Sequence, residues 1–125
     1  MNTNDYQKLA MRTNDGDSSI RLFIFGLRQN LQLNTAQLLN GCLGLAGEVG
    51  EFNDEVKKMI FHGKEPDVKH LQSELGDILW YIALICDTFH WDLDYIMRMN
   101  IHKLELRYPE GFDTDKSNNR KKDDI

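Results

Sequence analysis

The amino-acid sequence predicts an all-α protein, a bundle of four to five helices that associates with further copies through its helix faces. Apolar residues recur every three or four positions over long stretches, as they do along one face of an α-helix. Capping and turn residues separate these stretches, and no stretch has the alternating pattern of a strand. The chain of 125 residues has the usual size of one domain. We expect a single helical domain over residues 1–112 and a polar, flexible tail over residues 113–125.

The first part of the chain contains two predicted helices. A capping-box pattern in NDYQ predicts a short helix over residues 4–12. The segment TNDGDSS that follows has the composition of a loop. Ser18 or Ser19 can then cap a second helix over residues 20–32, IRLFIFGLRQNLQ.

A third and longer helix is unusual because it is rich in glycine. Thr35 can cap this helix, and Gly63 and Pro66 stop it. The glycines inside it are Gly41, Gly44, Gly47 and Gly50. Each interior glycine costs roughly 0.8–1 kcal/mol relative to alanine, so together they cost about 3–4 kcal/mol of helix propensity. Two explanations are open: a neighbouring helix packs closely against the small residues, or a ligand or metal cluster approaches the backbone beside Glu48 and Glu51.

Two further helices complete the predicted bundle. A fourth helix begins near Asp67 and carries apolar residues at helical spacing. Asp92 caps a fifth helix, which must end before Pro109 because proline cannot continue it. Cys42 and Cys86 both fall at apolar helix positions, so we expect buried free thiols rather than a disulfide.

Two pairs of acidic residues lie within the third and fourth helices. Glu48 and Glu51 are three residues apart, as are Glu74 and Asp77, and this spacing places the two side chains of a pair about 60° apart around a helix. None of these acids has a lysine or arginine three or four positions away, and residues 29–56 contain neither. Converging carboxylates repel one another, and a hard divalent cation such as Mg²⁺ or Mn²⁺ suits an all-oxygen ligand set. The alternative is a solvated acidic helix face, which is common on helical proteins.

Composition argues against several other classes of function. The net charge of −5 disfavours nucleic acid or an anionic membrane as the main partner. No stretch approaches the ~20 apolar residues of a membrane helix, and the polar start MNTNDYQKLA lacks a signal-peptide core, which favours a cytoplasmic protein. Neither Glu-x-x-His nor Cys-x-x-Cys occurs, so a di-iron bundle and a zinc site are also disfavoured.

In these motifs the chain resembles the MazG-like members of the all-α NTP pyrophosphohydrolase superfamily. The family pattern is E-x-x-E followed further along the chain by E-x-x-D, as in the two acidic pairs. The similarity extends to YQKLAMRT, LGLAGEVGEF, ELGDILWYIA and a closing N-x-x-K-x-x-x-R-Y-P-x-G-F over residues 100–112. In total the resemblance covers residues 5–115.

The resemblance implies Mg²⁺-dependent hydrolysis of a ribo- or deoxyribonucleoside triphosphate between its α and β phosphates, giving the monophosphate and pyrophosphate. Mn²⁺ can substitute for Mg²⁺. The residues it assigns as metal ligands and catalytic groups are Glu48, Glu51, Glu74 and Asp77. Glu51 or a nearby oxygen would orient the attacking water. Two alternatives stay open: a related enzyme acting on another pyrophosphate-linked substrate such as phosphoribosyl-ATP, and a non-catalytic, metal-binding helical interaction protein.

The fifth helix supplies candidate contacts to the phosphates. Asn100 lies in the middle of its apolar stripe, where an unsatisfied amide would be costly. Lys103 and Arg107 project from adjoining positions, and the three form a polar, cationic strip that can meet triphosphate oxygens. The commoner role of such an asparagine is a buried structural amide.

Other candidate substrate contacts are more scattered. Tyr81 follows Asp77 by one helical turn and can stack on a base or sugar. Lys58 and Arg12 are weaker candidates, for which a solvated surface charge is the alternative. The apolar faces of three helices are hard to cover within 125 residues, and the family forms dimers or dimers of dimers, so we expect at least a homodimer.

Overall fold

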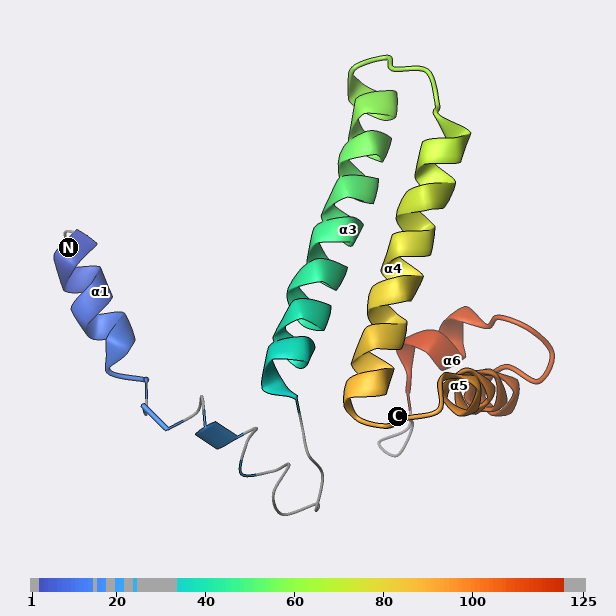
Figure 1. Cartoon of the computed structure of the whole chain (residues 1–125). Helices are drawn as coiled ribbons and strands as arrows, with labels where there is room; N and C mark the ends of the chain where they lie inside the picture. Colours follow the sequence, from blue (N-terminus) through green and yellow to red (C-terminus); the bar gives the residue numbers. More distant parts are fainter. Residues whose placement is uncertain (1–2, 15, 18–19, 22–23, 25–33, 121–125) are drawn as a thin grey trace. The chain divides into compact units, whose positions relative to one another are not determined.

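The computed structural model describes residues 3–14, 16–17, 20–21, 24 and 34–120, and this part of the chain is helical without any strand. Its helices are α1 (Thr3–Met11), α3 (Thr35–Phe61), α4 (Val68–Thr88), α5 (Leu93–Arg107) and α6 (Thr114–Asn118) (Figure 1). The predicted all-α class is therefore confirmed. The second predicted helix, residues 20–32, falls largely outside the described residues.

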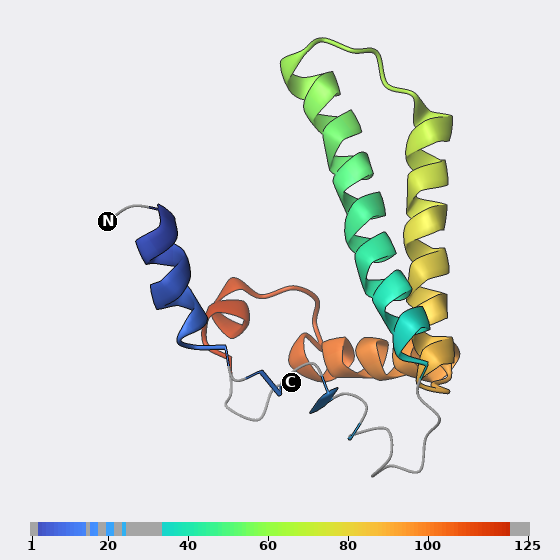
Figure 2. The ribbon, with the colours of Figure 1, turned by 60° about the vertical axis from the view of Figure 1, so that its left-hand side comes forward.

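The chain divides into two compact units, Met1–Phe89 and His90–Ile125. In the first unit, α3 and α4 lie side by side and run antiparallel, joined by the turn at residues 62–67 (Figures 1 and 2). Asp67 caps α4 as predicted, since its side chain accepts a hydrogen bond from the backbone N–H of His70 at 3.0 Å. The cap of α3 lies one residue before the predicted one, because Asn34 rather than Thr35 accepts the capping hydrogen bond.

Two of the helix glycines are explained by the contact between α3 and α4. A methyl group added to Gly41 would lie 2.7 Å from Cγ1 of Ile85, and one added to Gly44 would overlap the ring of Tyr81. By contrast, nothing lies within 4 Å of a methyl group added to Gly47 or Gly50. Close packing therefore accounts for the first two glycines and leaves the second two without a packing role within the described residues.

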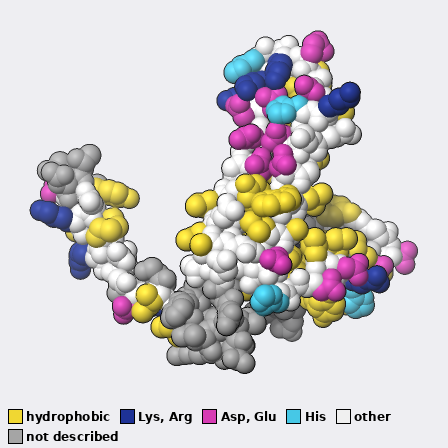
Figure 3. Space-filling view, in the orientation of Figure 1, with side chains coloured by type: hydrophobic (Ala, Val, Ile, Leu, Met, Phe, Trp, Pro, Cys, Tyr) yellow, Lys and Arg dark blue, Asp and Glu magenta, His cyan; other side chains and the backbone are white. Residues whose placement is uncertain are grey.

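The described part of a single chain buries little apolar surface. Among the described hydrophobic residues, only Leu38 and Cys86 are buried, whereas Leu43 is 72% exposed and Leu79 61% exposed. Figure 3 shows hydrophobic side chains gathered midway along the α3–α4 hairpin. Both cysteines are free thiols, as predicted, but Cys42 is exposed in the single chain, so the prediction of burial is wrong for that residue.

The second unit contains α5 and α6. Asp92 caps α5 as predicted, and the helix ends at Arg107, before the proline. The short helix α6 lies within residues 113–125, where the sequence predicted no helix, and Asp113 caps it by accepting from the backbone N–H of Lys116. None of the described helices combines the length and the apolar character needed to cross a membrane.

Candidate metal centre

Three carboxylates converge between α3 and α4. Glu48 comes from α3, while Glu74 and Asp77 come from α4. Each offers one oxygen, and these three oxygens all lie within 4.8 Å of one another. Because Glu74 and Asp77 are three residues apart on one helix, both can face the same point on the neighbouring helix. Acidic side chains gather on this face of the hairpin, on the side nearer the 62–67 turn (Figure 3).

The environment of this cluster favours a cation. Glu74 is 5% exposed, and its buried Oε2 has no hydrogen-bond partner among the described residues. The pKa of Glu48 is raised, first by desolvation and then by the negative charges of Glu51, Asp77 and Glu74. A divalent cation would supply the missing partner of the buried oxygen and neutralise the repulsion, so the donor set fits Mg²⁺ or Mn²⁺.

Glu51, the fourth predicted ligand, lies beside the three converging carboxylates rather than among them. It is exposed, yet its charge is the strongest of the charges that raise the pKa of Glu48. It lines an open pocket of about 340 Å³ together with other residues of the hairpin: Gly47, Gly50, Asp54, Glu55, Lys58 and His70. The two glycines without a packing role thus border this pocket, which favours the second explanation for them, an approach of a ligand to the backbone.

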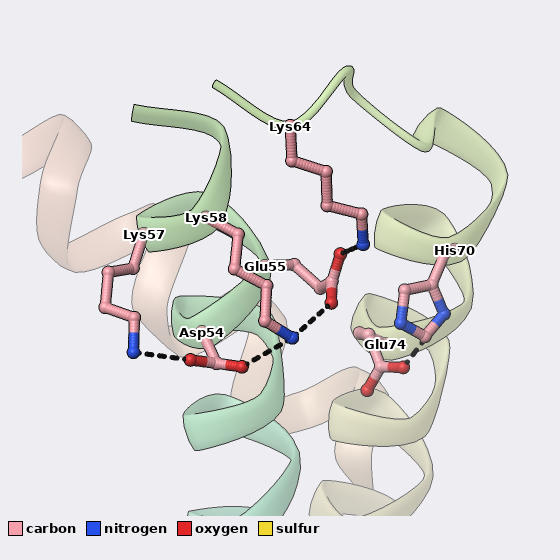
Figure 4. A network of polar contacts seen from close by, with 7 residues as sticks. All are labelled: Asp54, Glu55, Lys57, Lys58, Lys64, His70 and Glu74. Atoms are coloured by element: carbon pink, nitrogen blue, oxygen red, sulfur yellow. Dashed lines mark hydrogen bonds and ion pairs between the residues drawn. The ribbon is translucent and has the colours of Figure 1, made fainter. Parts of the chain in front are cut away.

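A network of ion pairs forms the wall of the pocket nearer the turn (Figure 4). Asp54 pairs with Lys57 and with Lys58 at 2.8 Å each, and hydrogen bonds from these lysines lower the pKa of Asp54 to about 2. The buried Glu55 pairs with Lys64 at 2.5 Å and with Lys58 at 3.2 Å, and hydrogen bonds from the same two lysines lower its pKa. Lys58 therefore lines the pocket, as a substrate contact should, but it already pairs with two carboxylates.

His70 is a feature of the site for which the sequence predicts no role. Its Nδ1 lies 3.3 Å from Oε1 of Glu74, and the histidine also borders the pocket (Figure 4). The two residues are four positions apart on α4. This spacing was the available signal, because side chains at positions i and i+4 are neighbours on a helix.

The remaining predicted contacts are not brought to the carboxylates by any described interaction. Tyr81 packs its ring against Gly44 and meets Trp80 edge to face at 5.0 Å between ring centroids, so a contact with a base stays a prediction. Arg12 follows α1 and is exposed. Its role also stays a prediction.

The predicted strip on α5 belongs to the other unit, His90–Ile125. Asn100 is exposed in the single chain, so the expected burial of its amide is wrong there. Lys103 and Arg107 are half-buried, and the Arg107 guanidinium lies 5.9 Å from the centroid of the Tyr108 ring. Their contact with phosphate stays a prediction.

Comparison with known proteins identifies the family of this chain. Residues 37–112 match the family model of the MazG nucleotide pyrophosphohydrolase domain, a segment that includes all of the predicted acidic ligands. The chain is also 34% identical over 83 residues to the "Gene 37 protein" of Mycobacterium phage L5, a match that covers 62% of this chain and 72% of that protein. No solved structure matches the chain. The extent of the family match shows that this chain belongs to the MazG nucleotide pyrophosphohydrolase family.

Proposed function

We propose that the protein is a nucleoside triphosphate pyrophosphohydrolase that requires Mg²⁺, for which Mn²⁺ can substitute, and cleaves ribo- or deoxyribonucleoside triphosphates between the α and β phosphates. The products would be the nucleoside monophosphate and pyrophosphate. Membership of the family supports the class of reaction. The observation that carries the proposal is the unpartnered, buried Oε2 of Glu74 within a cluster of three carboxylates, since no described lysine or arginine pairs with any of the three.

Glu48, Glu74 and Asp77 would hold the cation, and Glu51 would complete the acidic site from the pocket side. When bound, the cation supplies charge neutralisation for the triphosphate and lowers the pKa of a water molecule. Glu51 is exposed and borders the pocket, so it is suited to orient that water and to accept its proton.

The pocket would receive part of the nucleotide. Gly47 and Gly50 border it without side chains, so substrate groups can approach the backbone of α3. Lys58 can contact phosphate oxygens only by exchanging its ion pairs with Asp54 and Glu55. Further phosphate and base contacts would come from the other predicted residues: Arg12, Tyr81, Asn100, Lys103 and Arg107.

We also propose that the active form is at least a homodimer. A lone α3–α4 hairpin leaves large apolar side chains such as Leu43 and Leu79 in water, and a second copy would cover them. Two copies of a chain commonly associate through the same apolar helix face when one copy leaves this face exposed.

A panel of ribo- and deoxyribonucleoside triphosphates, incubated with Mg²⁺ or Mn²⁺ and analysed by anion-exchange chromatography, tests the proposal. We expect monophosphate and pyrophosphate from at least one nucleotide. Diphosphate and orthophosphate as products would overturn the proposed bond cleavage. Turnover of phosphoribosyl-ATP alone would favour the related enzyme that acts on another pyrophosphate-linked substrate. Metal binding without any turnover would favour a non-catalytic interaction protein.

A further inference from the structure

One histidine contacts the most buried carboxylate of the metal centre. His70 Nδ1 lies 3.3 Å from Oε1 of Glu74, whose side chain is 7% exposed (Figure 4). The backbone of His70 is itself fixed, because its N–H donates to the capping carboxylate of Asp67 at 3.0 Å. The start of α4 therefore fixes the backbone of His70, one turn before the glutamate.

The two oxygens of Glu74 have different surroundings. An ionised carboxylate only accepts hydrogen bonds, and Nδ1 of His70 is the nitrogen that lies 3.3 Å from Oε1. Oε2 is buried and has no partner among the described residues, and Glu74 belongs to the cluster with Glu48 and Asp77. One oxygen thus lies beside the histidine, while the other has no partner among the described residues and is available to a cation.

We propose that His70 is a positioning residue that orients Glu74 for metal binding; this inference rests on the proposed function. Without the cation, Glu48 and Asp77 repel Glu74, and a glutamate has several rotamers through which it can turn away. A donor at the Nδ1 position, 3.3 Å from Oε1, would oppose this rotation. Outer partners of this kind orient ligands in many metal sites, and their loss typically weakens metal binding about 10–100-fold.

His70 also borders the pocket that Glu51 lines, so it lies at the boundary between the metal centre and the space proposed for the nucleotide. Its effect should nevertheless be on the metal rather than on the chemical step. We therefore expect loss of the imidazole to raise the Mg²⁺ concentration needed for half-maximal activity by a larger factor than it lowers kcat at saturating Mg²⁺.

The test compares His70→Leu with His70→Asn. Leucine removes the donor, whereas the asparagine Nδ2 occupies nearly the same position relative to Cβ as the histidine Nδ1. Gln72→Leu is the matched control, since Gln72 is an exposed residue of the same helix. Mn²⁺ binding to the full chain is measured by electron paramagnetic resonance of the unbound ion, and helix content by circular dichroism.

We expect Mn²⁺ affinity to fall about 10-fold in His70→Leu, at the lower end of the range for such partners. It should return towards the wild-type value in His70→Asn and stay unchanged in Gln72→Leu. If His70→Leu does not fold, His70→Phe keeps a ring without a donor and provides the same comparison. Wild-type affinity in the variants that lack the donor, or equal losses with Asn and with Leu, would overturn the inference and leave the proposed function intact. Absence of Mn²⁺ binding by the wild type would overturn both.

Discussion

Replacing Gly44 or Gly47 with alanine is expected to change stability in opposite directions. Both glycines lie inside α3, so each substitution gains roughly 0.8–1 kcal/mol of helix propensity. A methyl group on Gly44 would overlap the Tyr81 ring, and overpacking of this kind costs about 1–3 kcal/mol. Gly44→Ala should therefore lose up to about 2 kcal/mol, whereas Gly47→Ala, whose new methyl group meets nothing within 4 Å, should gain about 1 kcal/mol.

Thermal unfolding of both variants measures this difference. EDTA is present and the protein concentration is fixed, because metal binding and self-association each raise apparent stability. A change of 1 kcal/mol corresponds to roughly 4 °C in Tm for a domain of this size. We expect Gly47→Ala to melt above the wild type and Gly44→Ala at or below it. If Gly44→Ala were as stable as Gly47→Ala, the close approach of Tyr81 to α3 would be refuted, because the propensity gain is common to both.

Three further predictions concern the acids, the turn and the apolar face. The raised pKa of Glu48 means that the folded, metal-free protein holds this proton more tightly than the unfolded chain, so its stability falls as pH rises above 4.5 through the folded pKa. Glu48→Gln should accordingly raise Tm at pH 7 in EDTA. It should also abolish the increase in Tm that Mn²⁺ gives the wild type. A lower Tm of the variant in EDTA would contradict the repulsion between Glu48 and the neighbouring carboxylates. The lowered pKa of Glu55 has the opposite effect on the pH dependence of stability. Its ion pairs add stability above pH 4.5 that is lost as pH falls. Lys64→Met should lower the urea midpoint at pH 7, and in acid its midpoint should approach that of the wild type. A difference in urea midpoint that does not change with pH would count against this pairing. Light scattering at micromolar concentration should give at least twice the chain mass of 14.6 kDa, with Leu79→Arg shifted towards monomer; a monomeric wild type would exclude the proposed dimer.

The sequence predicts best those features that depend on neighbouring residues. Asp67 and Asp92 are helix caps in the structure as expected, because a cap needs only a side-chain oxygen and the next few backbone N–H groups. The cap of α3 was placed one residue too late, since Asn34 and Thr35 are both acceptable caps and local preference does not separate them.

Features that depend on helix register or on a partner were less predictable. The convergence of Glu48 with Glu74 and Asp77 was expected, but the position of Glu51 beside them depends on how α3 is rotated against α4. The exposure of Cys42 in the single chain is hard to predict for a related reason. Apolar periodicity identifies a face to be covered and does not reveal whether the same chain or a second copy covers it.

We propose that these carboxylates bind a cation needed for release of pyrophosphate. The most direct test is pyrophosphate production from the preferred nucleotide by wild type and by Glu74→Gln, each with Mg²⁺ and with EDTA. We expect rapid pyrophosphate release only by the wild type with Mg²⁺, restored when Mg²⁺ is added back after EDTA, while Glu74→Gln keeps its helix content. Pyrophosphate release that persists in EDTA, or in Glu74→Gln, would show that these carboxylates do not act through a bound cation.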